Sequence, residues 1–108
     1  MTGDSISRAE EAYLSARAAC RAVELSLDAN ETQRAQARTA RDAMWAAYSQ
    51  GTLDTFAARS QMLGKLIGAL DGVIAGMKGG GGVLLNGLNA AVSSLSALSI
   101  EENEKNSG

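Results

Sequence analysis

The chain of 108 residues contains no proline and no histidine, and it has a single cysteine, Cys20. Proline breaks helices and histidine is the commonest metal ligand, so their absence removes helix breaks and the usual metal sites. One cysteine excludes a disulfide within the chain and cannot build a thiolate metal site. Because Ala, Leu, Arg and Glu are abundant, we expect an almost entirely helical protein.

Groups suited to catalysis are also scarce. Without histidine Cys20 lacks the usual general base, and adjacent carboxylates such as Glu10 and Glu11 face different directions on a helix. The four glycines at 79–82 are not followed by the Lys-Ser/Thr pair of a phosphate-binding loop. We therefore expect no enzyme activity, no cofactor, no metal ion and no small-molecule substrate.

Charge of one sign does not predominate, since the formal net charge is −2 at pH 7. No strong field attracts a polyanion, and nucleic acid is not an expected partner. The first residues are polar and of mixed charge, without the apolar core of a cleavable signal peptide. We expect synthesis in the cytoplasm, and the sequence is compatible with export by a route that cleaves no signal.

The first predicted helix, residues 4–28, carries apolar side chains at alternating spacings of three and four, which is a heptad seam. The seam consists of Ile6, Ala9, Tyr13, Ala16, Cys20, Val23 and Leu27. Asp4 or Ser5 can cap its start. Beside the seam runs a row of positive and negative charges, which predicts a solvated face with weak ion pairs. That row is Glu10, Arg17, Arg21, Glu24 and Asp28.

Short polar residues predict a turn near 28–31, after which Asn30 and Gln33 can form a capping pair for a second helix over 31–49. One continuous helix to about residue 49 remains an alternative, because no glycine or proline enforces the break. The second helix has an apolar stripe of mostly small residues: Ala37, Ala40, Met44 and Ala47. Gly51 suits a left-handed cap at its end, and Thr52 can open the next helix.

A basic and aromatic strip runs along the second helix at spacings of four and three. It consists of Arg34, Arg38, Arg41, Trp45 and Tyr48. Trp and Arg are enriched at binding hot spots, so this strip is a candidate surface for a protein partner. Nearby Glu31 and Asp42 offset part of its charge and weaken the case for nucleic acid.

The third predicted helix, residues 53–78, has a glycine at every fourth position. These are Gly64, Gly68, Gly72 and Gly76, and Gly80 continues the spacing. Each interior glycine costs a helix roughly 0.5–1 kcal/mol relative to alanine, so a compensating contact is expected. The pattern predicts a glycine zipper, in which small residues let a second helix approach closely. That helix is either the fourth helix of the same chain or the same helix of another copy.

The other face of the third helix is apolar. We expect it to bury Phe56, Leu63, Ile67, Leu70, Ile74 and Met77, with Leu66 and Val73 on the far side. The tetraglycine 79–82 predicts a hinge or tight reversal. A fourth helix over 83–99 follows, with a heptad stripe of Leu84, Leu88, Ala91, Leu95 and Leu98. Residues 100–108 are expected to be a fraying polar tail.

Together these patterns predict an all-α fold of three or four helices in one domain, 1–108. It consists of two consecutive helical hairpins, a charged amphipathic one over 4–50 and an apolar, glycine-faced one over 53–99. The expected function is a non-enzymatic subunit that forms homo-oligomers or docks to a larger assembly through the glycine zipper. One alternative is a membrane-active protein that inserts 53–100 as a hairpin. A second is a soluble adaptor that binds its partner through the Arg34 to Tyr48 face.

Overall fold

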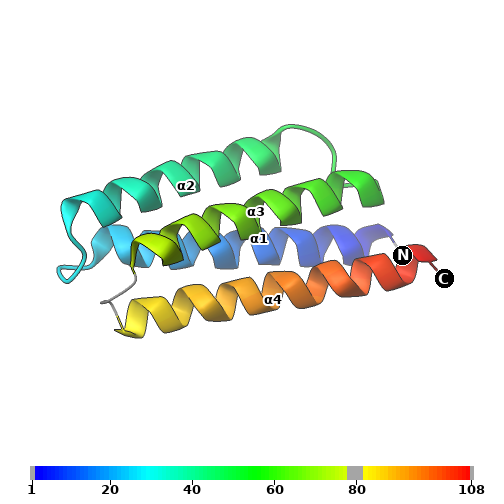
Figure 1. Ribbon diagram of the computed structural model, residues 1–108. Coiled ribbons are helices and arrows are strands. Elements are labelled where there is room, and N and C mark those ends of the chain that lie inside the picture. Colours follow the sequence, from blue (N-terminus) through cyan, green and yellow to red (C-terminus); the bar gives the residue numbers. More distant parts are fainter. Residues whose placement is uncertain (1, 78–81, 108) are drawn as a thin grey trace.

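The computed structural model describes residues 2–77 and 82–107, and this part of the chain is all-α, as predicted (Figure 1). It forms four helices, without strands in those ranges: α1 (Thr2–Leu25), α2 (Glu31–Ser49), α3 (Phe56–Gly76) and α4 (Gly82–Ser107). The predicted hinge at 79–82 lies outside the described residues except for its last glycine, which begins α4, and Gly80 also lies outside them.

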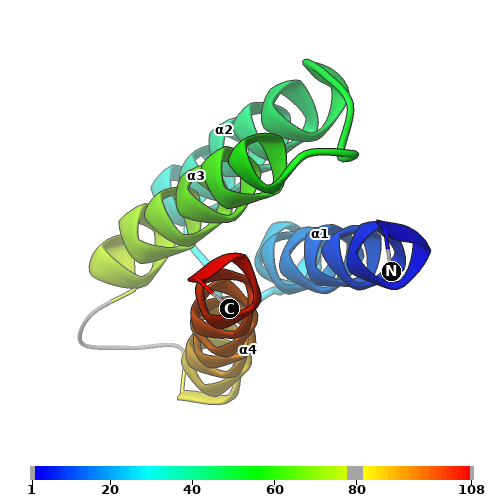
Figure 2. The ribbon, with the colours of Figure 1, turned by 90° about the vertical axis from the view of Figure 1, so that its right-hand side faces the viewer.

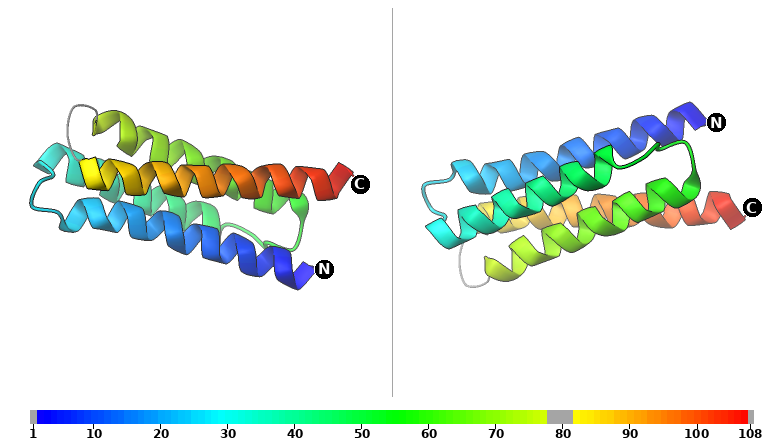
Figure 3. Two further views of the ribbon diagram at one scale, coloured as in Figure 1. Left: turned by 90° about the horizontal axis from the view of Figure 1, so that it is seen from below. Right: turned by 90° about the horizontal axis from the view of Figure 1, so that it is seen from above.

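Successive helices run in opposite directions and form a four-helix bundle that measures 44 × 22 × 17 Å (Figures 1 and 2). Each helix packs on its neighbours in the chain, α4 closes the bundle against α1, and α1 also touches α3 across it. Within the described residues, α2 and α4 do not contact each other. The start of α1, the end of α4 and the α2–α3 loop lie at one end (Figure 3). Because α2 and α3 also pack together, the two predicted hairpins form one unit.

The break between α1 and α2 is set by the capping box predicted at Asn30. The Gln33 amide donates to Asn30 Oδ1 at 2.8 Å, and the Asn30 amide donates to Gln33 Oε1 at 2.9 Å. Two backbone donors that the helix leaves free are thereby satisfied. The alternative of one continuous helix is therefore wrong.

Other predicted helix ends shift by a few residues. Asp4 and Ser5 lie inside the first turn of α1, which begins at Thr2. At its other end α1 stops at Leu25, so Leu27 drops out of the predicted seam and is 95% exposed. The reason is that the chain has already turned toward Asn30 at that point.

The α2–α3 connection also differs from prediction. Gln50, with φ −79° and ψ 10°, caps the end of α2, and Gly51 does not take the predicted left-handed conformation. Thr52 accepts a bond from the Asp54 amide at 3.0 Å and stabilises a turn instead of opening a helix. Thr55 is the actual N-cap of α3, and its Oγ1 accepts from the Ala58 amide at 3.1 Å.

Three of the four predicted core stripes are confirmed in large part. The buried members of the predicted stripes are Ala9, Tyr13, Ala16, Cys20 and Val23 in α1, Ala37, Ala40 and Met44 in α2, and Leu88, Ala91, Leu95 and Leu98 in α4. Ile6, Ala47 and Leu84 are only half-buried. Alternating spacings of three and four therefore identified the core faces of these helices.

The core face of α3 is rotated from the predicted one. Leu66 and Val73, expected on the far side, are buried, whereas Ile67 and Ile74 are only half-buried. The buried seam along α3 and its C-cap is Arg59, Leu63, Leu66, Leu70, Val73 and Met77, again with alternating spacings of four and three, and Met62 beside it is also buried. Because α3 is apolar on several faces, its neighbours decide which face is buried.

The polar tail predicted to fray is instead helical to Ser107. Glu102 in this segment is 5% exposed, and its Oε1 accepts a bond from Nε of Arg59 at 3.0 Å. Arg59 Nη1 also donates to the Leu53 carbonyl at 2.7 Å. Nearby, Arg8 and Glu101 form a bidentate ion pair between α1 and α4. These pairs hold the last turns of α4 on the bundle.

Candidate functional site

Three of the four glycines of α3 face outward. Gly64, Gly68 and Gly72 are exposed, and a Cβ atom added to any of them would meet no atom within 4 Å outside its immediate surroundings. The expectation that the fourth helix of the same chain covers them is therefore wrong, because α4 packs against a different side of α3. A contact with another copy or another protein stays a prediction.

Gly76, the last residue of α3, differs from the other three. A Cβ there would overlap the end of the Gln36 side chain, and the Gly76 carbonyl accepts a bond from Gln33 Nε2 at 3.1 Å. Gly76 therefore belongs to the α2–α3 contact within the chain. The predicted interface on the exposed surface reduces to Gly64, Gly68 and Gly72.

Beside these glycines a shallow groove of about 470 Å³ runs between α2 and α3. Most of its lining side chains are small: Thr32, Ala35, Gln36, Thr39, Ala40, Ala43, Gly68, Ala69, Gly72 and Val73. Ala35, Thr39 and Ala43 follow each other at four-residue spacing on the exposed side of α2. The groove is thus a smooth surface made by two helices, without charged groups in its lining.

The predicted basic strip on α2 is largely engaged within the chain. Arg34 donates twice to the Ser26 carbonyl, at 3.0 and 3.2 Å, which fastens the α1–α2 loop. Arg38 and Arg41 lie 3.7 and 3.1 Å from the carboxylate of Glu24. Glu24 is thus a member of the predicted charged row that lies against α2 instead of being fully solvated.

The two aromatic members of the strip behave differently from each other. Tyr48 stacks on Tyr13 of α1, with ring centroids 4.3 Å apart and planes within 8°. Burial, and secondarily the Glu10 carboxylate, raise the pKa of the Tyr48 phenol. Trp45 is 57% exposed, with its ring centroid 6.0 Å from that of Tyr48. Of the strip, Trp45 offers the largest exposed apolar group.

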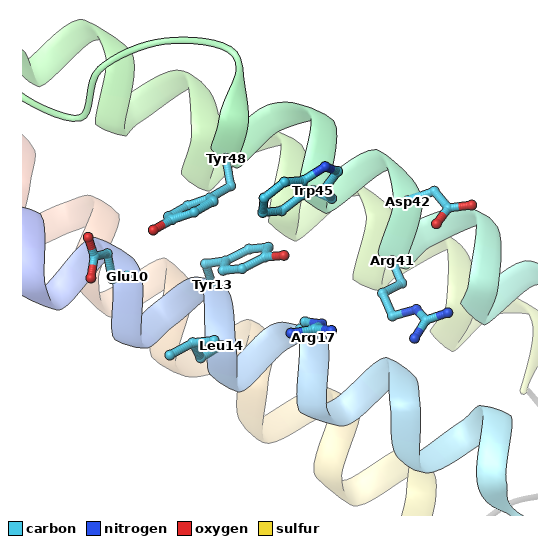
Figure 4. A pocket seen from close by; sticks show the side chains of 8 residues that line it. All are labelled: Glu10, Tyr13, Leu14, Arg17, Arg41, Asp42, Trp45 and Tyr48. Carbon is cyan, nitrogen blue, oxygen red and sulfur yellow. The ribbon is translucent and has the colours of Figure 1, made fainter.

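These aromatic rings form the floor and wall of an open cleft of about 510 Å³ between α1 and α2 (Figure 4). It is lined by Glu10, Tyr13, Leu14, Arg17, Arg41, Asp42, Trp45 and Tyr48. Figure 4 shows Glu10 at one end near the Tyr48 hydroxyl, and Arg17 and Arg41 toward the other end. Leu14, between them, is 55% exposed.

Sequence reasoning missed this cleft. Leu14 lies outside the heptad seam, and Glu10 and Arg17 were assigned to a solvated face. The available signal was an apolar residue placed between two opposite charges on the same side of a helix, at 10, 14 and 17. That spacing does not show which part of α2 lies alongside α1.

Cys20 is fully buried in the α1 seam, as expected for a small core residue. Burial raises the pKa of its thiol to about 11, with a further contribution from Glu24. The thiol is therefore protonated at neutral pH and poorly nucleophilic. Among the residues that the structure describes, no cluster of three or more Cys, Asp or Glu side chains is arranged to hold a metal ion.

Within residues 2–77 and 82–107, one helix, α4, is long and apolar enough to span a membrane by length and composition. A core helix of a soluble protein passes the same test, but such a helix is mostly buried. In α4 only 22% of the apolar stretch is buried. From Gly82 to Ile100 its exposed face carries no charge, and it combines small or amide side chains with the large apolar side chains of Val83 and Ile100. That exposed face consists of Gly82, Val83, Asn86, Gly87, Asn89, Ala90, Ser93, Ser94, Ala97 and Ile100.

Comparisons with known proteins found no match for this chain. No protein-family model matches the sequence, no curated protein matches it, and no solved structure matches it.

Proposed function

We propose that the protein is a non-enzymatic assembly subunit whose copies associate through the exposed glycine face of α3. The observation that carries the proposal is the regular row of Gly64, Gly68 and Gly72 on an outward surface, beside the small side chains of α2. Both sides of the groove are smooth, and a second helix can lie along them.

Helix energetics support this proposal. Three interior glycines lower the stability of α3 by roughly 1.5–3 kcal/mol relative to alanine, and no contact within the described chain requires them there. Glycine permits two helix backbones to approach closely, which adds dispersion and weak Cα–H···O contacts. The contacts made by a docked helix would therefore offset the stability that the glycines remove from the isolated chain.

Cysteine cross-linking tests the contact directly. In a Cys20→Ala background, Gly68→Cys should give disulfide-linked dimers under mild oxidation, because Gly68 is the middle of the row and lies nearest to its own counterpart across a two-fold axis. A disulfide requires Cα atoms within about 7 Å. Ala90→Cys, on the exposed face of α4, is the matched control and should remain monomeric on a non-reducing gel. Equal cross-linking at both positions would reflect random collision and would contradict the proposal.

Overpacking supplies a second test. Gly68→Leu should lower the mass of the species seen by light scattering after size exclusion, because its side chain would separate the two backbones. Ala22→Leu adds a leucine to an exposed site on α1 and should leave that mass unchanged. If Gly68→Leu and Ala22→Leu keep the wild-type mass and helicity, the glycine face is not the contact.

The uncharged outer face of α4 favours a second candidate, insertion of 53–100 into a membrane as a helical hairpin. This route would require α3 and α4 to leave the bundle and expose Leu66 and Leu95 to lipid. Co-sedimentation with vesicles of neutral phospholipid tests it, with Ser94→Asp as the variant that should abolish binding through the cost of a buried charge. Wild-type protein that stays in the supernatant would exclude this candidate.

A further inference from the structure

The cleft between α1 and α2 carries two half-exposed apolar side chains with opposite charges on either side. Leu14 is 55% exposed and Trp45 57% exposed, although both are large and apolar. Glu10 and Arg17 are exposed, and within the described residues neither has an ion-pair partner. This surface lies on a different side of α2 from the glycine groove.

The two charges are arranged so that the surface complements itself. Glu10 and Arg17 are seven residues apart, so they lie on one side of α1, separated by about two turns. Their midpoint falls between Tyr13 and Leu14. A two-fold axis at this midpoint, perpendicular to α1, places Glu10 of each copy opposite Arg17 of the other.

We propose that this cleft is the interface of a two-fold symmetric homodimer, with α1 of one copy antiparallel to α1 of the other. The Leu14 side chains meet near the axis, and the Trp45 indole of each copy extends the apolar contact. Two Glu10–Arg17 ion pairs form at the periphery and fix the antiparallel register. A parallel arrangement is disfavoured, because it would set Glu10 against Glu10 and Arg17 against Arg17.

The charges of the cleft favour a second copy over a polyanion. Arg41 is already held by Glu24 at 3.1 Å, and Glu10 stands at the opposite end of the same cleft. An acidic peptide or a nucleic acid would meet both a cation and a carboxylate there. A second copy presents the same two charges in reversed order and satisfies both of them.

Charge reversal tests this arrangement. Glu10→Arg and Arg17→Glu each create two like-charge contacts per dimer, and each should raise the dimer dissociation constant on the order of tenfold or more, measured by sedimentation velocity. When the two variants are mixed, every contact becomes attractive again. Native mass spectrometry should then show the heterodimer in preference to both homodimers. The double variant Glu10→Arg/Arg17→Glu should dimerise like the wild type.

Trp45→Ala provides an uncharged test of the same interface. It should weaken the dimer on the order of tenfold or more, because it removes the largest exposed apolar group of the cleft. Helix content by circular dichroism should stay unchanged, since the indole is half in solvent. Ala22→Leu is the control and should dimerise normally. Failure of Glu10→Arg and Arg17→Glu to prefer each other in the mixture would overturn the proposal.

The masses of the assemblies that single variants form distinguish this interface from the glycine face. Two different two-fold contacts on one chain build assemblies larger than a dimer. Glu10→Arg should leave glycine-face dimers, Gly68→Leu should leave cleft dimers, and the combined variant should be a monomer of 11.1 kDa. If Glu10→Arg alone gives monomers, the cleft is the sole interface and the glycine proposal fails. If Glu10→Arg has no effect on mass, the cleft proposal fails instead.

Discussion

Replacing the exposed glycines with alanine should affect the isolated chain and the assembly in opposite directions. In the single chain a methyl group at Gly68 or Gly72 meets open space, so nothing opposes the better helix propensity of alanine. Gly68→Ala/Gly72→Ala should therefore stabilise the monomer by about 1–2 kcal/mol. With an unfolding entropy typical of a domain of this size, the melting temperature rises by about 4–8 °C.

The assay is a thermal melt followed by circular dichroism at concentrations low enough to populate the monomer, in the Glu10→Arg background. At high concentration the same pair of alanines should weaken glycine-face association, because two added methyl groups per chain hold the helices apart. Gly76→Ala is the internal comparison. It should give a smaller gain, since the end of Gln36 must move and the site is the last turn of α3.

A fall in the monomer melting temperature would refute this reasoning, because it would mean that some part of the chain lies against these glycines. A rise at both low and high concentration, with the mass of the assembly unchanged, would instead remove the glycine face from the proposed interface. The sign of the change decides between these cases, so the precise magnitude matters little.

Three further predictions concern the interior and a helix end. Glu102→Gln should lower the free energy of unfolding, measured by urea denaturation, by about 3–5 kcal/mol, because it leaves the charge of buried Arg59 uncompensated. Arg59→Met/Glu102→Leu should restore most of that loss, and an equal loss in both variants would contradict this prediction. Asn30→Ala should cost about 1 kcal/mol by removing the capping box, and no change in stability would mean that the cap is not needed. The pKa of Cys20 is raised to about 11 from 9.0, so the unfolded chain releases this proton first. Stability should then fall by about 2–3 kcal/mol as the pH rises through that interval, and a Cys20→Ala variant that shows the same decrease would contradict the assignment.

Features set by neighbouring residues were predictable from the sequence. The capping box at Asn30 depends on Gln33 three positions later, so local chemistry alone determines where α2 begins. The seams of α1 and α4 were also identified, because their apolar residues recur at alternating spacings of three and four. The same reasoning gave the all-α fold, in which the absence of proline leaves long helices uninterrupted.

The candidate site was only partly predictable. The sequence singled out Trp45 and the glycines of α3 as contact surfaces, and Trp45, Gly64, Gly68 and Gly72 are exposed. It did not place Leu14 beside Trp45, because that pairing depends on how α1 and α2 are aligned along their length. The arginines of the strip were expected to face a partner, but the Glu24 carboxylate and the Ser26 carbonyl already hold them.

Only the tertiary structure decided which side of α3 is buried. This helix is apolar on several faces, so its own periodicity does not distinguish Leu66 from Ile67, and the packing of α1, α2 and α4 makes the choice. The same packing leaves Gly64, Gly68 and Gly72 outside and draws Glu102 inward to Arg59, 43 residues away. Such long-range contacts depend on how whole helices fit together, and a local pattern carries no information about them.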